Sequence, residues 1–523
     1  MHIGKHFNKV IILLMIACLT LCNTSSASSV ISSGVSDTNI NHQLATQKKR
    51  NSINLPANSV NIKSYASYVG SDKDWSKAIA RAELSGKHIY FPEGNYKITN
   101  YITKKDGVNW YGAGTKSVIY FDNSFHYVKN KNGGYIIVNE HVASANSISD
   151  YDTFKIENLT FSTRYTDKAS FLIEGFWALG YTNNVVINKV KMDQSLDNAK
   201  QSRTFDFRGA NINTTVSNCD CIYNSTNGKW GSFTFRNFRK EASTGITIKN
   251  NTIARKCGGD ESGWICANVG DITNITIDSN TYKVADNTSQ SSVIFVLQTD
   301  TPSLAGTHKV SDVSIVNNKI YIPRFNYCAI RVGTYLPGYA NINNVTIKNN
   351  YIQCKFKNDA PNASGVGISL QYTTNSLVEG NTIYGLCKQY ISGADVARYN
   401  QALENDNDMG IETRGITNCK TVDGNNINVT GIGFVECYEL TRNTIIADYN
   451  LIQSKRYFYM SKNTFIKTSF TKDYIISTNI IDNTGNRAKP YVYALNNTFY
   501  NVTKQIFNGD MDLQLENNTT YNR

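Results

Sequence analysis

A short alternating strand that ends in an asparagine recurs along most of this chain, and no other feature constrains the fold as strongly. Each copy alternates apolar with polar residues and then reaches an Asn followed by another apolar residue. An apolar period of two, with many β-branched residues, indicates strands. Most copies begin about 30 residues apart, which is typical of a solenoid whose units are buried by their neighbours. The copies are KIENLTF at 155–161, ITIKNNTI at 246–253, ITIDSNTY at 275–282, VSIVNNKI at 313–320, VTIKNNYI at 345–352, SLVEGNTI at 376–383, KTVDGNNI at 420–427, YELTRNTI at 438–445 and YMSKNTF at 459–465.

The recurrent Asn also predicts how the corners of the solenoid are built. Asn tolerates the left-handed backbone conformation of a sharp corner, and its amide can bond to the equivalent Asn of the next coil. Ordinary surface turn residues would keep no fixed phase with the strands, whereas these Asn do. We therefore expect Asn251, Asn280, Asn318 and Asn350 to line one internal corner.

The segment ahead of the array, residues 58–125, has a different pattern. Trp75, Ala78, Ile79 and Ala82 lie at the i, i+3, i+4 and i+7 spacing of one amphipathic helix. Two stretches that read as short strands follow the helix, the first of them broken by a Pro-Glu-Gly turn. They are HIYFPEGNYKIT at 88–99 and GVNWYGAGTKSVIYF at 107–121.

This succession of helix, strand, turn and strand resembles the N-terminal cap and first coils of the pectate lyase superfamily, which also includes phage tailspikes and exopolysaccharide-processing proteins. The resemblance implies an all-β fold, a right-handed single-stranded parallel β-helix with an N-terminal helical cap. That superfamily contains lyases, hydrolases, epimerases and non-catalytic members. The reaction therefore has to be argued from this chain's own residues.

The first residues have the pattern of a secretory signal. Lys5 and Lys9 precede an apolar run, and the small residues at 25–27 suit a signal peptidase. We therefore expect a secreted or periplasmic protein. Lipoprotein anchoring at Cys18 is the alternative, disfavoured by Met15 at the first position of the cleavage box. The expected divisions are a signal peptide at 1–27, a flexible leader at 28–57, the cap and first coils at 58–125 and further coils at 126–523.

The charge balance favours a polyanionic partner. The chain has 53 Lys and Arg against 41 Asp and Glu, a net charge of +12. Because the positive charge is scattered and no nucleic-acid-binding module is recognised, an acidic polysaccharide is the expected partner and nucleic acid is not. After the signal, no stretch reaches the roughly 18 to 20 apolar residues of a membrane span. No cofactor is predicted, although a divalent cation such as calcium is left open.

The cysteines suggest packing and not metal binding. Of 11 cysteines, Cys18 and Cys22 would leave with the signal, so an odd number remains. Cys219 and Cys221 should face the same way on one strand, but they lack the second ligand pair that a zinc site needs. We expect them to be buried thiols stacked in the core.

A second kind of strand precedes each Asn corner, and it carries polar residues on its outward face. Aligning its apolar residues between coils predicts two outward rows. The first row is Asp206, Thr234, Cys266, Val296, Arg331, Ser369 and Glu412, and the second is Arg208, Arg236, Asn268, Gln298, Gly333, Gln371 and Arg414. Such rows suit a carbohydrate groove better than a merely solvated face. The expected substrate-binding residues are Arg208, Arg236, Trp264, Gln298, Arg331, Gln371 and Arg414.

Carboxylates near these rows are the candidate catalytic residues. Asp260 and Glu261 lie two coils from Asp206, roughly 10 Å at strand spacing, near the upper end for an inverting pair of carboxylates. Their segment, CGGDESGW, resembles the Gly-Asp-Asp stretch of polygalacturonase-type hydrolases, but this chain lacks that family's Gly-His-Gly and Arg-Ile-Lys. Asp408 and Glu412 form a reserve pair about six coils from Asp206.

The sequence thus favours an exported β-helix protein that cleaves an acidic polysaccharide by hydrolysis or β-elimination. One alternative is a non-catalytic protein that binds exopolysaccharide during its biosynthesis or export, and another is a structural adhesin. The sugar, the linkage, the choice between water and elimination and the oligomeric state are left open. His126, His141 and His308 have no consistent partner in the sequence.

Overall fold

A computed structural model gives the fold of the chain. The structure describes residues 56–165, 173–194, 203–223, 233–255, 263–267, 269–284, 290–297, 308–322, 325–333, 342–355, 366–371, 373–386, 409–414, 421–423, 426–429, 432–435, 439–447, 452–453, 458–467, 476–477, 491–501, 507–508 and 512–521.

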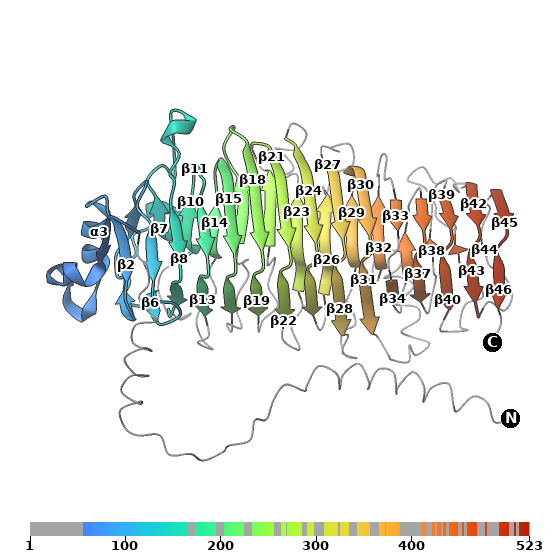
Figure 1. The fold of residues 1–523 in the computed structure, drawn as a ribbon, viewed down its shortest axis with the longest axis horizontal. Helices are drawn as coiled ribbons and strands as arrows, with labels where there is room; N and C mark the ends of the chain where they lie inside the picture. The colour runs from blue at the N-terminus through green and yellow to red at the C-terminus, as the bar shows by residue number, and fades with distance from the viewer. Residues whose placement is uncertain are drawn as a thin grey trace, which may run out of the picture. The chain divides into compact units, whose positions relative to one another are not determined.

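Three parallel sheets wind around one core and form a right-handed parallel β-helix (Figure 1). One coil runs from a strand of sheet C to a strand of sheet A and then to a strand of sheet B. In the coil β14, β15 and β16, for example, each strand pairs with its counterpart in the next coil, β17, β18 and β19. The predicted solenoid of strands is confirmed.

Within the described ranges, sheet A has 17 strands, sheet B has 15 and sheet C has 14. Sheet A comprises β1 (Ser59–Asn61), β2 (His88–Phe91), β5 (Trp110–Gly112), β8 (Lys155–Glu157), β11 (Thr182–Asn183), β12 (Val186–Asn188), β15 (Asn211–Ser217), β18 (Ser243–Lys249), β21 (Ile272–Asp278), β24 (Val310–Val316), β27 (Ile342–Lys348), β30 (Thr373–Glu379), β33 (Thr421–Asp423), β36 (Glu439–Thr441), β39 (Phe458–Ser461), β42 (Tyr491–Leu495) and β45 (Asp512–Glu516). Sheet B comprises β3 (Gly94–Lys97), β6 (Ser117–Phe121), β9 (Thr160–Thr163), β13 (Lys191–Gln194), β16 (Asp220–Tyr223), β19 (Thr252–Arg255), β22 (Thr281–Val284), β25 (Lys319–Ile322), β28 (Tyr351–Lys355), β31 (Thr382–Leu386), β34 (Asn426–Val429), β37 (Thr444–Ala447), β40 (Thr464–Lys467), β43 (Thr498–Tyr500) and β46 (Thr519–Tyr521). Sheet C comprises β4 (Ile102–Lys104), β7 (Tyr135–Asn139), β10 (Gly175–Leu179), β14 (Arg203–Phe207), β17 (Phe233–Asn237), β20 (Gly263–Ala267), β23 (Gln290–Leu297), β26 (Phe325–Gly333), β29 (Val366–Gln371), β32 (Met409–Arg414), β35 (Ile432–Val435), β38 (Ile452–Gln453), β41 (Ile476–Ser477) and β44 (Phe507–Asn508).

The predicted amphipathic helix is present as α3 (Ser76–Glu83). Its apolar residues Ala78, Ile79 and Ala82 are buried, and α3 lies at the end of the stack that begins with β2 (Figure 1). Short 3-10 helices are η1 (Ile62–Tyr68), η2 (Ser71–Lys73), η3 (Lys131–Gly134) and η4 (Ile148–Asp150). In the part of the chain that the structure describes, no helix is long and apolar enough to cross a membrane.

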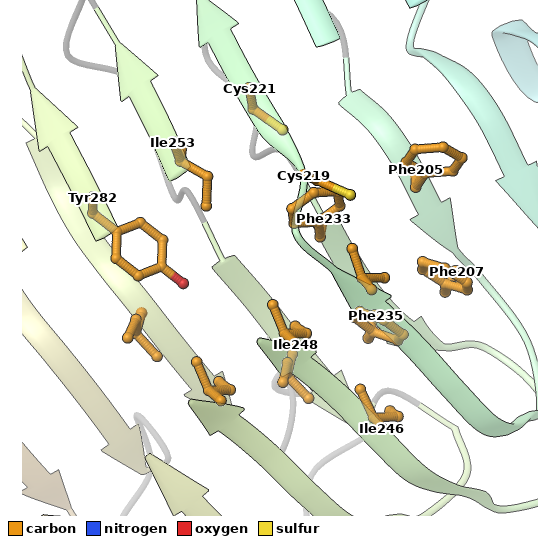
Figure 2. Close-up of a cluster of buried hydrophobic side chains, with 14 of the residues drawn as sticks. Phe205, Phe207, Cys219, Cys221, Phe233, Phe235, Ile246, Ile248, Ile253 and Tyr282 are labelled. Carbon is orange, nitrogen blue, oxygen red and sulfur yellow. The ribbon is translucent and has the colours of Figure 1, made fainter. Parts of the chain in front are cut away.

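Stacked side chains fill the interior of the coils (Figure 2). Phe207 and Phe235 lie parallel, with ring centroids 4.2 Å apart and planes 2° from each other. Cys219 and Cys221 are buried in the same core and form no disulfide within the described ranges (Figure 2). Burial raises the pKa of the Cys219 thiol to about 12, so the thiol stays protonated. The prediction of buried core thiols is confirmed.

The corner between sheets A and B contains the predicted asparagine ladder. The amide nitrogen of Asn318 donates to the amide oxygen of Asn350 at 3.0 Å, and that same oxygen accepts the backbone N–H of Asn318. These bonds continue from coil to coil, and every ladder Asn is buried except Asn518 at the end of the ladder, which is half-buried. The ladder runs through Asn251, Asn280, Asn318, Asn350 and Asn381, and again through Asn443, Asn463, Asn497 and Asn518.

The structure corrects one part of the corner prediction. The left-handed residue is not the ladder Asn but the residue before it, for example Asn317, with φ of 57°, ahead of Asn318. The preceding position therefore turns the chain, while the ladder Asn satisfies polar groups inside the corner. Ser279, Arg442 and Lys462 also occupy the turning position with positive φ, so that position does not require Asn.

Candidate functional site

The strand register defines the outward row that contains Asp206. Asp206 pairs with Thr234 of β17, Thr234 with Trp264 of β20, and Trp264 with Phe295 of β23. Beyond Phe295 the row continues through Arg331, Ser369 and Glu412.

The predicted rows were therefore wrong in β20 and β23. Cys266 and Val296 do not belong to the first row, and the second-row positions predicted for Asn268 and Gln298 are held by Cys266 and Leu297. Cys266 pairs with Arg236 and belongs to the second row, while Val296 is fully buried in the core and pairs with Val332. The alignment slipped because these two strands carry apolar residues on both faces. Sequence periodicity then no longer distinguishes the faces.

Several predicted site residues lie wholly or partly outside what the structure describes. Asp260, Glu261, Asp408, Asn268 and Gln298 lie outside the described residues. For a second group, only the place of the residue in its strand is described. These residues are Trp264 of β20, Gln371 of β29, and Glu412 and Arg414 of β32. Their roles stay predictions.

Asp206 lies at the centre of a buried cluster of charges on the outer face of sheet C, and its side chain is fully buried. Arg236 binds both of its carboxylate oxygens, and Thr234 donates its hydroxyl to Oδ1 at 2.6 Å. The phenol of Tyr135, at the start of β7, donates to Oδ2. These hydrogen-bond partners of the carboxylate thus come from two strands of sheet C, β7 and β17, that lie on either side of β14.

Two more arginines surround the same carboxylate. Arg203 Nη1 lies 3.9 Å from Asp206 Oδ2 and 3.5 Å from a carboxylate oxygen of Glu174. Arg208 Nε lies 4.0 Å from Asp206 Oδ2. The side chains of Arg203 and Arg236 are 2% and 10% exposed, whereas that of Arg208 is 33% exposed. Arg208 is therefore the arginine of this cluster that a large ligand can reach most easily.

These contacts fix the protonation states in the cluster. Burial alone would raise the pKa of Asp206, but the charges of Arg236 and Arg203, with the hydrogen bonds, outweigh it and hold that pKa below its usual value. Burial and then the charge of Asp206 raise the pKa of Tyr135. Asp206 is therefore an anion and Tyr135 a neutral donor at ordinary pH. In this arrangement Asp206 has no proton to donate to a substrate.

Arg208 lies against aromatic rings as well as beside the carboxylate. Its guanidinium carbon is 5.4 Å from the ring centroid of Tyr135 and 5.3 Å from that of Phe238. Gly133 packs against the same guanidinium, since a Cβ at that position would come within 3.2 Å of Arg208 Nη1. The rings and the glycine hold a planar cation at the surface.

Arg331 lies in the same outward row but in a different environment. It is 1% exposed, and its guanidinium carbon is 5.3 Å from the ring centroid of Phe295. Because the Arg331 side chain is buried, its predicted contact with substrate would require the residues that cover it to move.

A second polar cluster lies just beyond the end of β7, and sequence reasoning missed it. His141 Nδ1 is 2.6 Å from Oδ1 of Asp152, a fully buried carboxylate. The other carboxylate oxygen accepts the backbone N–H of His141 and the amide of Asn139. The imidazole is 36% exposed. Because His141 and Asp152 are 11 residues apart across an irregular loop, no period in the sequence links them.

The turns between sheets C and A pack this loop closely. A Cβ on Gly180 would lie 2.1 Å from the carbonyl oxygen of Val142, so a residue with a side chain does not fit there. Arg239, three coils further along, donates to that same oxygen at 3.2 Å. Its guanidinium carbon is 5.6 Å from the ring centroid of Tyr181, whose hydroxyl donates to Glu241 at 3.2 Å. A histidine, an arginine and a tyrosine from separate coils thus meet at one edge of sheet C.

Among the described residues, no group of three or more His, Cys, Asp or Glu side chains is arranged to hold a metal ion.

No protein-family model matches this chain, and no curated protein matches its sequence. Solved structures of similar shape include a tailspike protein of E. coli bacteriophage HK620, in complex with a hexasaccharide, which is 12% identical over 87% of this chain and 75% of that chain, with a TM-score of 0.49. The A-module of a mannuronan C-5 epimerase from Azotobacter vinelandii is 11% identical over 88% of this chain and 98% of its own, with a TM-score of 0.40. The Streptococcus pneumoniae surface protein and adhesin PfbA is 12% identical over 89% of this chain and all of its own, with a TM-score of 0.40. With TM-scores below 0.5, these likenesses carry no argument about function.

Proposed function

We propose that this protein is exported and acts on an acidic polysaccharide that it binds along the outer face of sheet C. The observation that carries the proposal is the environment of Arg208. Its guanidinium is a third exposed, lies over two aromatic rings and stands 4.0 Å from a buried carboxylate. A fixed planar cation beside aromatic rings suits a sugar ring that bears a carboxylate.

The other arginines of the cluster support this role indirectly. Arg236 is committed to both oxygens of Asp206, and Arg203 lies between Asp206 and Glu174. They position the cluster, while Arg208 is the arginine left to contact a ligand. The net charge of +12 would attract a polyanion towards the protein.

The proposal includes a more specific step, in which the protein cleaves the bound polymer by hydrolysis or β-elimination. Asp260 and Glu261 stay the first candidate carboxylates, with Asp408 and Glu412 as the reserve pair, while Asp206, which was predicted with the first pair, is buried and ionised and suits a positioning role better than proton transfer. Six strand pairings separate Asp206 from Glu412 in the register, roughly 29 Å at strand spacing, so they cannot serve one reaction centre.

One observation favours a second function, binding without cleavage. Asp206 is buried, ionised and bound by Arg236, Thr234 and Tyr135, so it is not poised as a general acid or base. A protein that holds exopolysaccharide during its biosynthesis or export would need the cluster for recognition alone.

Binding and product formation test the two functions separately. The full-length protein would be titrated with a panel of acidic polysaccharides and a neutral glucan at several salt concentrations. Arg208→Gln should weaken acidic-polymer binding and flatten its salt dependence. Arg164→Gln is the matched control, because Arg164 stacks on Tyr120 after a strand of sheet B, with its guanidinium carbon 3.9 Å from the ring centroid.

Reducing ends and the absorbance of unsaturated product would then report hydrolysis and elimination. Salt-dependent binding without either product would select the non-catalytic function. Absence of binding to every acidic polymer would overturn the proposal.

A further inference from the structure

The second polar cluster, around His141, has no part in the carbohydrate site described so far. His141 is partly exposed, but its Nδ1 is fixed at 2.6 Å from a fully buried carboxylate. With Asp152 accepting at Nδ1, the Nδ1–H tautomer of the neutral imidazole is favoured. The second ring nitrogen, Nε2, then carries the lone pair. This is the orientation in which a histidine accepts a proton from a substrate.

The loop could be held in place without the hydrogen bond from the imidazole ring of His141 to Asp152. The backbone N–H of His141 already bonds to Asp152, at 2.8 Å, and Asn139 holds the same carboxylate oxygen at 2.7 Å. The loop is therefore fastened without the ring. The ring takes the remaining oxygen through Nδ1, while the side chain as a whole stays 36% exposed.

A cation contacts the backbone of the loop that carries the histidine. Arg239 donates to the carbonyl oxygen of Val142, the residue after His141, although 97 positions separate the two along the chain. Its guanidinium can bind a substrate carboxylate and stabilise negative charge that develops beside it. Arg208 occupies a turn between those of His141 and Arg239, about two coils or roughly 10 Å from His141 at strand spacing. One polymer could therefore contact both clusters.

Resting on the proposed function, we propose that His141 is the base of an elimination reaction on a uronate-containing polysaccharide, with Asp152 as its positioning residue and Arg239 binding the uronate carboxylate. Nε2 takes the proton from the carbon that bears the carboxylate, C5. The electron pair of that C–H bond forms the C4=C5 double bond. The C4–O bond breaks, its pair stays on the glycosidic oxygen, and that oxygen takes a proton from water. The imidazolium returns its proton to solvent.

The test uses the full-length protein and an acidic polysaccharide that the parent binds. His141→Gln keeps a polar group that can reach Asp152 but cannot serve as a base. Turnover, followed by the absorbance of unsaturated product, should fall about 100-fold or more with little change in binding. His126→Gln is the matched control, since His126 is exposed and its backbone N–H bonds to Thr99. Melting temperatures would confirm that both variants fold.

Asp152→Asn separates a positioning role from a purely structural one. The charged groups that face His141 are Asp152, Glu140 and Asp150, with Arg239 beside Val142. The hydrogen bond that the His141 ring donates to Asp152 raises the pKa of His141, so the substitution should lower that pKa in an NMR titration of the ring. Because a base must be deprotonated, the rising limb of the pH–rate profile should move to lower pH in parallel, with reduced kcat and little change in KM.

The outcomes distinguish this inference from the proposed function. Unchanged turnover in His141→Gln, or release of reducing ends without unsaturated product, would overturn the assignment of His141 while polysaccharide binding stands. Parent protein that binds the polymer but forms no product would also overturn it. Failure of the parent to bind any acidic polymer would overturn the proposed function as well.

Discussion

The corner between sheets A and B is built from different residues in the coils before residue 220 and in those after it. In the earlier coils the corner position holds Leu159, Val190 and Cys219, and in the later coils it holds the ladder Asn. The positions are equivalent, because the strand that follows each corner bonds to the corner carbonyl of the coil before it. Lys191 bonds to Leu159 in this way, and Thr281 bonds to Asn251.

The outer face of sheet C differs between the same two regions. In the earlier coils this face carries Asp206 of the buried cluster, and His141 lies in the turn that follows β7. The later coils contribute Thr234 and Arg236 to this cluster, and beyond them the Asp206 row continues through Phe295, Arg331 and Ser369, which are all buried. The backbone of a coil thus accepts either an apolar or an amide corner, while its outer face is elaborated independently. The following four predictions test this separation, from the largest expected effect to the smallest.

Removal of Asp206 should have the largest effect. Asp206→Ala would leave Arg203 and Arg236 buried without their carboxylate, which costs about 3–5 kcal/mol of unfolding free energy. Chemical denaturation would measure the loss. Arg208→Gln, at a partly exposed position, should cost less than about 1 kcal/mol. Similar losses for the two variants would mean that the cluster is not a buried unit.

A break in the ladder should have the next largest effect. Asn318→Leu would leave the backbone N–H of Asn280 without its side-chain acceptor and would remove the bonds that link the Asn318 side chain to the Asn280 amide and the Ile277 carbonyl, at a cost of about 3 kcal/mol. Asn317→Gly is the matched control, because glycine tolerates the positive φ of that position. Thermal unfolding of both variants checks the prediction. Equal stability would show that the ladder does not contribute to it.

The ion pair of His141 should give a small effect that depends on pH. The pKa of His141 is raised in the folded state, chiefly by the hydrogen bond that its ring donates to Asp152. The pair therefore stabilises the fold fully below the ordinary pKa of His, about 6.5, and this stabilisation is lost as pH rises through the folded pKa. Because the ring is 36% exposed, we expect less than about 1 kcal/mol. The melting temperatures of the parent and His141→Gln should converge between pH 5.5 and 8.5. A constant difference would contradict the pairing.

Conversion of an early corner into a ladder corner should have the smallest effect. The backbone N–H of Cys219 already donates to Asn251 at 2.9 Å, and its thiol lies 3.9 Å from the carbonyl of Ile187, the acceptor that a ladder amide would use. Cys219→Asn should therefore change the unfolding free energy by less than about 1 kcal/mol. Denaturant titration would measure it. A loss comparable with that of Asn318→Leu would mean that the two kinds of corner are not interchangeable.

The sequence by itself predicted the parts of the molecule that repeat. A period of two, a phased Asn and an amphipathic helix each depend on neighbours close in the chain or at a fixed spacing, so the solenoid, the ladder residues and α3 could be predicted. The same reasoning failed at Cys266 and Val296, because β20 and β23 are apolar on both faces and periodicity does not then set the register.

Only the tertiary structure decided which polar groups meet. The sequence identified Asp206 and its neighbouring arginines, but their burial and the phenol of Tyr135, 71 positions away, become visible only when coils stack. His141 and Asp152 are joined by an irregular loop, and Arg239 reaches them from three coils away. Contacts of this kind depend on the stacking of separate coils and on loop geometry, for which the local sequence pattern carries no signal.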